Sequence, residues 1–247
     1  MDAFTRFTNQ TQGRDRLFRA TQYTCMLLRY LLESKAGSEK LVMKLKKLES
    51  SVSSGRKWFR LGNVVHAVQA TEQSIRAADP VPRLCLTLAN LNRVVYFVCD
   101  TVLWAKSVGL ASRVHRERWQ LRAARHYYCF LLLSLLRDLY EIALHLAQAA
   151  DRGAGREKAP LDAQGWQAGD HGESEQLQPS VLLLFRSLKR HPPLLLDTVK
   201  NLCDILIPLN QLGLCRPSLG IIGLGGLLSS LVGMVTVAYP QMKLKTR

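Results

Sequence analysis

The stretch SLGIIGLGGLLSSLVGMVTVAY, residues 218–239, decides the fold class of this 247-residue chain. It contains 22 residues and no charged side chain. An α-helix rises 1.5 Å per residue, so about 20 apolar residues cross the hydrocarbon core of a bilayer. The stretch therefore predicts a transmembrane helix. The alternative is a buried helix of a soluble protein.

Small residues recur along one face of this predicted helix. Gly225, Ser229 and Gly233 follow one another at intervals of four residues. Such residues let two helix backbones approach closely in lipid, which predicts self-association through the span. The run GIIGLGG is similar to a phosphate-binding loop, but no Lys-Ser/Thr pair follows it, so we expect no nucleotide site there.

Basic residues flank the predicted span. Arg216 precedes it, and Lys243, Lys245 and Arg247 follow it in the tail 240–247. Because basic residues collect on the cytosolic side of membranes, we expect this tail in the cytosol. The whole chain has a net charge of +15 and a pI near 9.9, which predicts an anionic partner, either phospholipid headgroups or nucleic acid.

A second apolar segment, LCLTLANLNRVVYFVCDTVLWA, covers residues 84–105 and is long enough to cross a bilayer. It contains Arg93 and Asp100, and a charge at the bilayer centre costs roughly 2.5–3.5 kcal/mol on insertion scales. The two residues are seven apart, so they share a helix face and are expected to line a bundle interior. The segment is a possible first span or a packed helix.

A basic amphipathic segment, SSGRKWFRLGNVVHAVQATEQSIRAA, covers residues 53–78. At 100° per residue, one helical face gathers the large apolar side chains and the opposite side carries arginines. Such a helix can lie in the headgroup layer and wedge between lipids. The alternative is an ordinary packed helix. The apolar face consists of Trp58, Leu61, Val64, Val65, Val68 and Ile75.

Helical periodicity dominates the rest of the chain, so the fold class is predicted to be all-α: a multi-helical integral membrane protein with amphipathic helices and a C-terminal transmembrane helix. Residues 150–178 are Gly-rich and polar and carry a net charge of −3, which indicates a disordered linker. The predicted regions are a basic cytosolic region 1–83 with amphipathic helices, a membrane-associated helical segment 84–149, the acidic linker 150–178, a helical hairpin 179–217, the span 218–239 and the basic cytosolic tail 240–247.

No catalytic or metal-binding motif is present in the sequence. The six cysteines show no C-x-x-C spacing, and neither H-E-x-x-H nor G-x-S-x-G occurs. We therefore expect no enzyme activity, no cofactor and no metal. Residues 113–128 form a basic segment with interleaved aromatics, but no recognition motif accompanies it, so we expect no nucleic-acid partner.

Four stretches of this sequence resemble the peroxisomal membrane protein 11 family. They are TQGRDRLFRATQY (11–23), SSGRKWFRLGN (53–63), YFVCDTVLWA (96–105) and the Gly-rich final span. The length, the acidic linker and the short basic tail most resemble the alpha group of that family. The resemblance covers nearly the whole chain.

The resemblance implies a multi-pass protein of the peroxisomal membrane with both termini in the cytosol. It implies that the chain promotes peroxisome proliferation by deforming and elongating the membrane before fission. The amphipathic segment would carry this remodelling through Arg56, Lys57, Trp58, Phe59, Arg60, Leu61, Val64, Val65 and Val68.

The implied partners are an anionic phospholipid membrane, further copies of the chain and its paralogues, a tail-anchored fission adaptor, a dynamin-like GTPase and the import receptor for peroxisomal membrane proteins. The tail KLKTR matches the family's coat-binding K-x-K-x-x signature through Lys243 and Lys245, which implies coatomer as a further partner. An alternative function is a pore or transporter for small metabolites, which the charged residues Arg93 and Asp100 motivate. A third, weaker possibility is a soluble helical bundle that binds nucleic acid.

Overall fold

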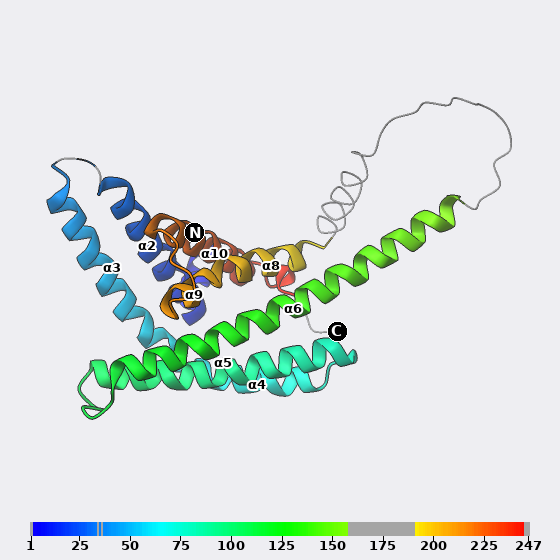
Figure 1. Cartoon of the computed structure of the whole chain (residues 1–247), viewed down its shortest axis with the longest axis horizontal. Helices are drawn as coiled ribbons and strands as arrows, with labels where there is room; N and C mark the ends of the chain where they lie inside the picture. The colour runs from blue at the N-terminus through cyan, green and yellow to red at the C-terminus, as the bar shows by residue number, and fades with distance from the viewer. Residues whose placement is uncertain (1, 34, 36, 158–190, 245–247) are drawn as a thin grey trace.

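The computed structural model describes residues 2–33, 35, 37–157 and 191–244, and all the regular structure in these residues is helical (Figure 1). The prediction of an all-α chain is therefore confirmed. The elements are α1 (Asp2–Asn9), α2 (Thr11–Leu32), α3 (Glu39–Arg60), α4 (Asn63–Ile75), α5 (Pro80–Ser107), α6 (Arg116–Glu157), α8 (Pro192–Asp204), α9 (Leu206–Gln211), α10 (Leu219–Ala238) and the short 3-10 helix η1 (Pro240–Met242).

The helices form two groups that are joined by α3 (Figure 1). In the first group α4, α5 and α6 pack side by side, with α5 in contact with both neighbours. In the second group α10 packs against α2 and α8. The long helix α6 also contacts α8 and α9, which connects the groups. The first and last long helices of the chain, α2 and α10, are thus direct neighbours.

Prolines set two of the helix starts. Pro80 begins α5, and Pro192 begins α8. Proline suits the first turn of a helix because its missing N–H has no intrahelical partner there. Gly109 and Gly213 lie in the turns before α6 and α10 with φ of 86° and 71°, values that only glycine adopts without strain.

The predicted single helix over 53–78 is wrong. Helix α3 continues through Ser53 and Ser54, the first residues of that segment, and ends at Arg60. Helix α4 begins at Asn63, after Leu61 and Gly62. Glycine in a helix interior is less stable than alanine by about 1 kcal/mol, which favours a break at Gly62, whereas Gly55 lies within α3 beside the Phe18 ring.

Three other boundaries differ from the predictions. Helix α1 was not expected, and α6 continues to Glu157, into the segment predicted as a disordered linker. The remainder of that linker and residues 179–190 of the predicted hairpin lie outside the described residues. The predicted hairpin 179–217 is, in its described part, two consecutive helices that meet at Ile205. Pro208 cannot donate to the carbonyl of Asp204, which explains the break.

Candidate membrane interface

Helix α10 presents large apolar side chains on its outer face. Its N-terminus is capped by Ser218, whose Oγ accepts a hydrogen bond from the Ile221 backbone N–H at 3.3 Å. The helix has a mean hydropathy of 2.0 over 20 residues, and among the described residues it is the one helix long and apolar enough to cross a membrane. The exposed apolar residues of this face are Leu219, Ile221, Leu224, Leu228, Leu231 and Val235. An apolar face of this length suits acyl chains.

The opposite face of α10 is built of small residues that receive α2. A Cβ added to Gly223 would lie 3.1 Å from the Leu27 backbone nitrogen, and one added to Gly220 would lie 2.6 Å from the Tyr30 ring. Gly226 meets the ring of Tyr23 in the same way. Because residue numbers rise along α10 while they fall along α2, the two helices are antiparallel.

The three residues predicted to mediate self-association belong to this buried surface. Gly225 faces Leu206 of α9, Gly233 faces Arg16 of α2, and Ser229 is completely buried. Small residues do allow close helix approach here, but the approaching helices belong to the same chain. The predicted dimer contact through Gly225, Ser229 and Gly233 therefore has no free surface in this structure.

A buried ion pair lies beside α10. The Arg19 guanidinium of α2 donates to Oδ1 of Asp204 of α8, and both side chains are less than a tenth exposed. Burial alone would raise the pKa of Asp204, but the Arg19 charge holds it below its usual range. Removing one partner would leave the other as an unpaired buried charge.

The arginines of the amphipathic segment point into the protein, contrary to the predicted exposed polar face. The Arg56 Nε donates to Asp15 Oδ1 at 3.0 Å. The Arg60 Nη1 donates to the Tyr96 hydroxyl at 3.0 Å, and its Nη2 lies 3.1 Å from Asp100 Oδ2. The carboxylates of α2 and α5 attract these cations, and no sequence spacing reveals such long-range partners.

The predicted apolar face of this segment is outward in part. Trp58, Val65, Val68 and Ile75 are more than half exposed, at 61%, 61%, 52% and 56%. Phe59, in contrast, packs edge-on against Phe18 with ring centroids 5.2 Å apart. Lys57, Leu61 and Val64 are half-buried. Four residues of the predicted apolar face thus remain available to a membrane, on both sides of the break between α3 and α4.

An exposed apolar stripe on α5 was missed by the sequence reading. Its members recur at intervals of three and four residues, the period of one helix face. Helix α5 packs against α4 and α6, whereas the side chains of the stripe are between 40% and 62% exposed. The same spacing is present in the sequence of residues 84–105, alongside the charged residues Arg93 and Asp100. The stripe consists of Leu84, Leu88, Leu91, Val95 and Val98.

The chain matches a family model along most of its length. The model described as peroxisomal biogenesis factor 11 (PEX11) matches residues 1–238. The chain belongs to this PEX11 family. It is 72% identical to the human protein "Peroxisomal membrane protein 11A" and 70% identical to the rat protein of the same name, and each match covers both chains completely. The human "Peroxisomal membrane protein 11B" is 43% identical over 99% of this chain and 100% of its own length. No solved structure matches the chain.

Family membership agrees with the geometry of α10. The PEX11 chain is a peroxisomal membrane protein with a helix capable of spanning the bilayer, and its family implies a role in peroxisome biogenesis and proliferation. Helix α5, the possible first span, does not qualify as a candidate span. Arg93 and Asp100 do share an inward face, as predicted, since Arg93 lines a cavity and Asp100 pairs with Arg60.

A second charged cluster of the PEX11 chain joins α6 to α8. The Arg137 Nη2 donates to Asp197 Oδ2 at 2.7 Å, and Asn201 Nδ2 donates to Asp138 Oδ2 at 3.0 Å. Asp138 Oδ1 lies 3.0 Å from Arg137 Nε without hydrogen-bond geometry. Burial raises the pKa of Asp138 to about 6, although Arg137 opposes the shift.

The C-terminal tail of the PEX11 chain is described as far as residue 244. Lys243 is exposed at the rim of the cavity that Arg93 lines, together with Gln10 from the start of the chain. Lys245, the second residue of the predicted coat-binding signature, lies outside the described residues. The residues before α2 and after α10 therefore meet in one place.

Proposed function

We propose that this PEX11-family chain is a non-enzymatic protein that promotes peroxisome proliferation by remodelling, elongating and preparing the peroxisomal membrane for fission. The observation that carries the proposal is the inverted distribution of polarity. Arg19 and Arg56 are buried, whereas Trp58 and Val65 are more than half exposed. Such a distribution is costly in water and favourable where the surface meets acyl chains.

The mechanism combines an anchor and a wedge. Helix α10 holds the chain in the bilayer. Trp58, Val65 and Val68 then enter the headgroup layer, and full burial of each large apolar side chain yields about 1.5–3 kcal/mol. Insertion into one leaflet expands that leaflet, and many anchored copies add their effects on curvature.

We propose that the chain is multi-pass with both termini in the cytosol, so that at least one segment crosses the bilayer besides α10, the one candidate span among the described residues. The antiparallel contact of α2 with α10 supports this topology, because it brings Gln10 and Lys243 to one level of the protein. Arg14 and Arg16 lie at the same end, and clustered basic residues favour the cytosolic side. Protease treatment of intact organelles should remove tags from both termini together. Protection of one tag would contradict this topology.

The partners belong to the same proposal. They are further copies of the chain and its paralogues, a tail-anchored fission adaptor, a dynamin-like GTPase, the peroxisomal membrane-protein import receptor, and coatomer through Lys243 and Lys245. The resemblance of the sequence to the family is the ground for proposing them. Contact between copies would use outward residues such as the α5 stripe rather than the occupied glycine face of α10.

The test uses the full-length chain in liposomes that contain anionic phospholipid. We expect the unaltered chain to form tubules that electron microscopy can count, and the variant Val65→Asp/Val68→Asp to lose this activity, because charged side chains do not enter the acyl layer. The matched control, Gln69→Asp/Gln73→Asp, adds the same charge at exposed polar positions of α4. Equal tubulation by the Val65→Asp/Val68→Asp variant would contradict the wedge.

A second candidate function is a pore for small metabolites. The specific observation in its favour is Arg93, which lines a cavity of about 400 Å3 inside the helix bundle. A pore that uses this residue should conduct ions in planar bilayers, and Arg93→Leu should abolish the conductance. Absence of conductance from the unaltered chain would exclude this function.

A further inference from the structure

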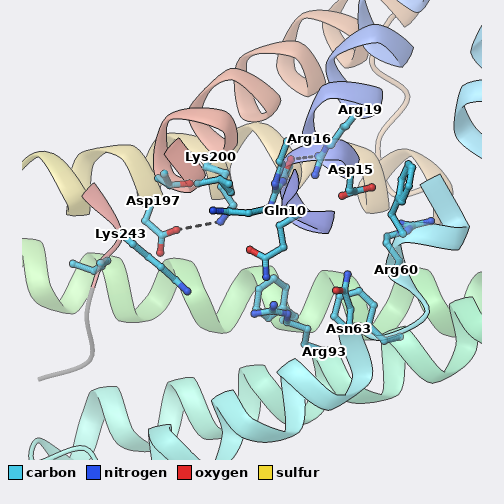
Figure 2. Close-up of a pocket in the computed structure, with 18 of the residues that line it drawn as sticks. Gln10, Asp15, Arg16, Arg19, Arg60, Asn63, Arg93, Asp197, Lys200 and Lys243 are labelled. Atoms are coloured by element: carbon cyan, nitrogen blue, oxygen red, sulfur yellow. Dashed lines mark hydrogen bonds and ion pairs between the residues drawn. The ribbon is translucent and has the colours of Figure 1, made fainter. Parts of the chain in front are cut away.

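The cavity lies where the two ends of the chain meet the helix bundle (Figure 2). It measures about 400 Å3 and is lined by residues of α2, α3, α4, α5, α6, α8 and α10 and by the segments before α2 and after α10. Pockets that hold small ligands measure about 300–1,000 Å3. The space therefore suits a compact ligand and not a folded partner.

Basic residues outnumber acidic ones around the cavity. Seven arginines and lysines line it against three aspartates. Each aspartate is already paired: Asp15 with Arg56 at 3.0 Å, Asp197 with Lys200 at 3.1 Å, and Asp204 with Arg19. A positive excess remains that the carboxylates of the lining do not neutralise.

The excess charge is carried by Arg16, Arg93 and Lys243. None of them has a carboxylate within 4 Å among the residues that the structure describes. The Arg93 guanidinium instead lies over the rings of Phe97 and Phe130, at 5.6 and 5.7 Å from their centroids. Burial lowers the pKa of Arg93, and the like charge of Arg16 lowers it further. An anion between these groups would relieve both effects.

We propose that this cavity binds a phosphate-bearing anion through Arg16, Arg93 and Lys243. These three cations come from α2, α5 and the tail, and Figure 2 shows them around one space. A guanidinium offers two parallel N–H donors that match two phosphate oxygens, and an ammonium adds a point charge. The side-chain amides of Gln10 and Asn63 line the same space and can donate to hydroxyl or ester oxygens.

Two sources supply this chemistry. One is the headgroup of a polyphosphorylated phospholipid, which would enter from the bilayer surface near the end of α10. The other is a soluble phosphorylated metabolite. In either case the bound anion would contact both Arg16, near the start of the chain, and Lys243, in the tail after α10. This inference does not depend on membrane remodelling or on conductance, because binding is measured at equilibrium without either.

The experiment uses the full-length chain in phosphatidylcholine nanodiscs. In one arm, inositol trisphosphate is titrated and its affinity measured by calorimetry, with myo-inositol as the uncharged comparison. In the other arm, the discs contain phosphatidylinositol bisphosphate, and the thermal midpoint of the protein is compared with that in phosphatidylcholine alone. Binding in the first arm identifies a site open to soluble phosphates, and stabilisation in the second arm alone identifies a lipid headgroup site.

The variant Arg16→Gln/Arg93→Gln should weaken binding at least about tenfold, because it removes two charge-assisted contacts. The matched control Arg118→Gln/Arg125→Gln makes the same charge change at exposed positions of α6 and should alter affinity less than about twofold. Lys243→Gln lies on the exposed tail, so it tests the site without disturbing the core and should also weaken binding. Unchanged affinity in the cavity variants, an equal loss in the control, or no binding in either arm would overturn the proposal.

Discussion

Helix α10 and the junction between α3 and α4 bury opposite kinds of residue. Helix α10 turns glycines inward and leucines outward, whereas the junction turns Arg56 and Arg60 inward and Trp58 outward. In both regions the neighbouring helices determine which residues are buried. The aromatic rings of α2 fit only against glycines of α10, and the carboxylates of α2 and α5 attract the arginines of α3. The comparison teaches that apolar character alone does not identify the buried face of this chain.

Removing a buried charge near α10 is expected to have the largest effect on folding. Arg19→Met leaves Asp204 without its partner and should lower the free energy of unfolding by about 3–5 kcal/mol. The double variant Arg19→Met/Asp204→Leu should recover most of this loss, since two apolar side chains replace the pair. Unfolding in mixed detergent micelles measures both. An equally unstable double variant would show that the site needs charge rather than packing.

Filling the glycine face should have the next largest effect. Gly226→Leu places a side chain against the Tyr23 ring and should destabilise the α2–α10 contact by about 1–3 kcal/mol. Cross-linking between cysteines introduced into α2 and α10 should fall in parallel. The control Leu224→Ile changes the outward face of the same helix and should leave both measurements unchanged. Retained cross-linking in Gly226→Leu would show that the contact between α2 and α10 does not require glycine at this position.

The cluster between α6 and α8 predicts a pH dependence. Because burial raises the pKa of Asp138 to about 6, above its unfolded value near 4, the folded state binds this proton more tightly. This contribution to stability is complete below the unfolded pKa and is lost as the pH rises through about 6. Lowering the pH from 7 to 5 should add roughly 1–2 kcal/mol from this group.

Asp138→Asn provides the check on that dependence. Denaturation midpoints measured at both pH values should show a smaller pH difference in this variant than in the unaltered chain. An identical difference in the two proteins would assign the pH dependence to other groups.

The smallest effect on stability is expected at the outward residues of α4. Val65→Ser should change the free energy of unfolding in detergent by less than about 0.5 kcal/mol, since the side chain is 61% exposed. Ala67 lies on the same helix but is fully buried, so Ala67→Leu should cost about 1–3 kcal/mol. Similar losses in the free energy of unfolding in the two variants would show that the two faces of α4 do not differ in burial.

The sequence supported some of these features better than others. The predicted span 218–239 agrees closely with α10, because a run of 22 residues without a charge has few possible structures other than one apolar helix. The inward face shared by Arg93 and Asp100 followed from their spacing. The positions of Arg56 and Gly225 did not, because their partners Asp15 and Leu206 are brought together only by the tertiary fold. Local periodicity shows which residues share a face but not which face is covered.

The antiparallel contact of α2 with α10 has a consequence for biosynthesis. Helix α2 is synthesised long before α10, so Tyr23 and its neighbours stay uncovered until α10 has been made. We therefore expect a chain that stops before residue 219 to be degraded faster than the full chain, even though most of its helices are present.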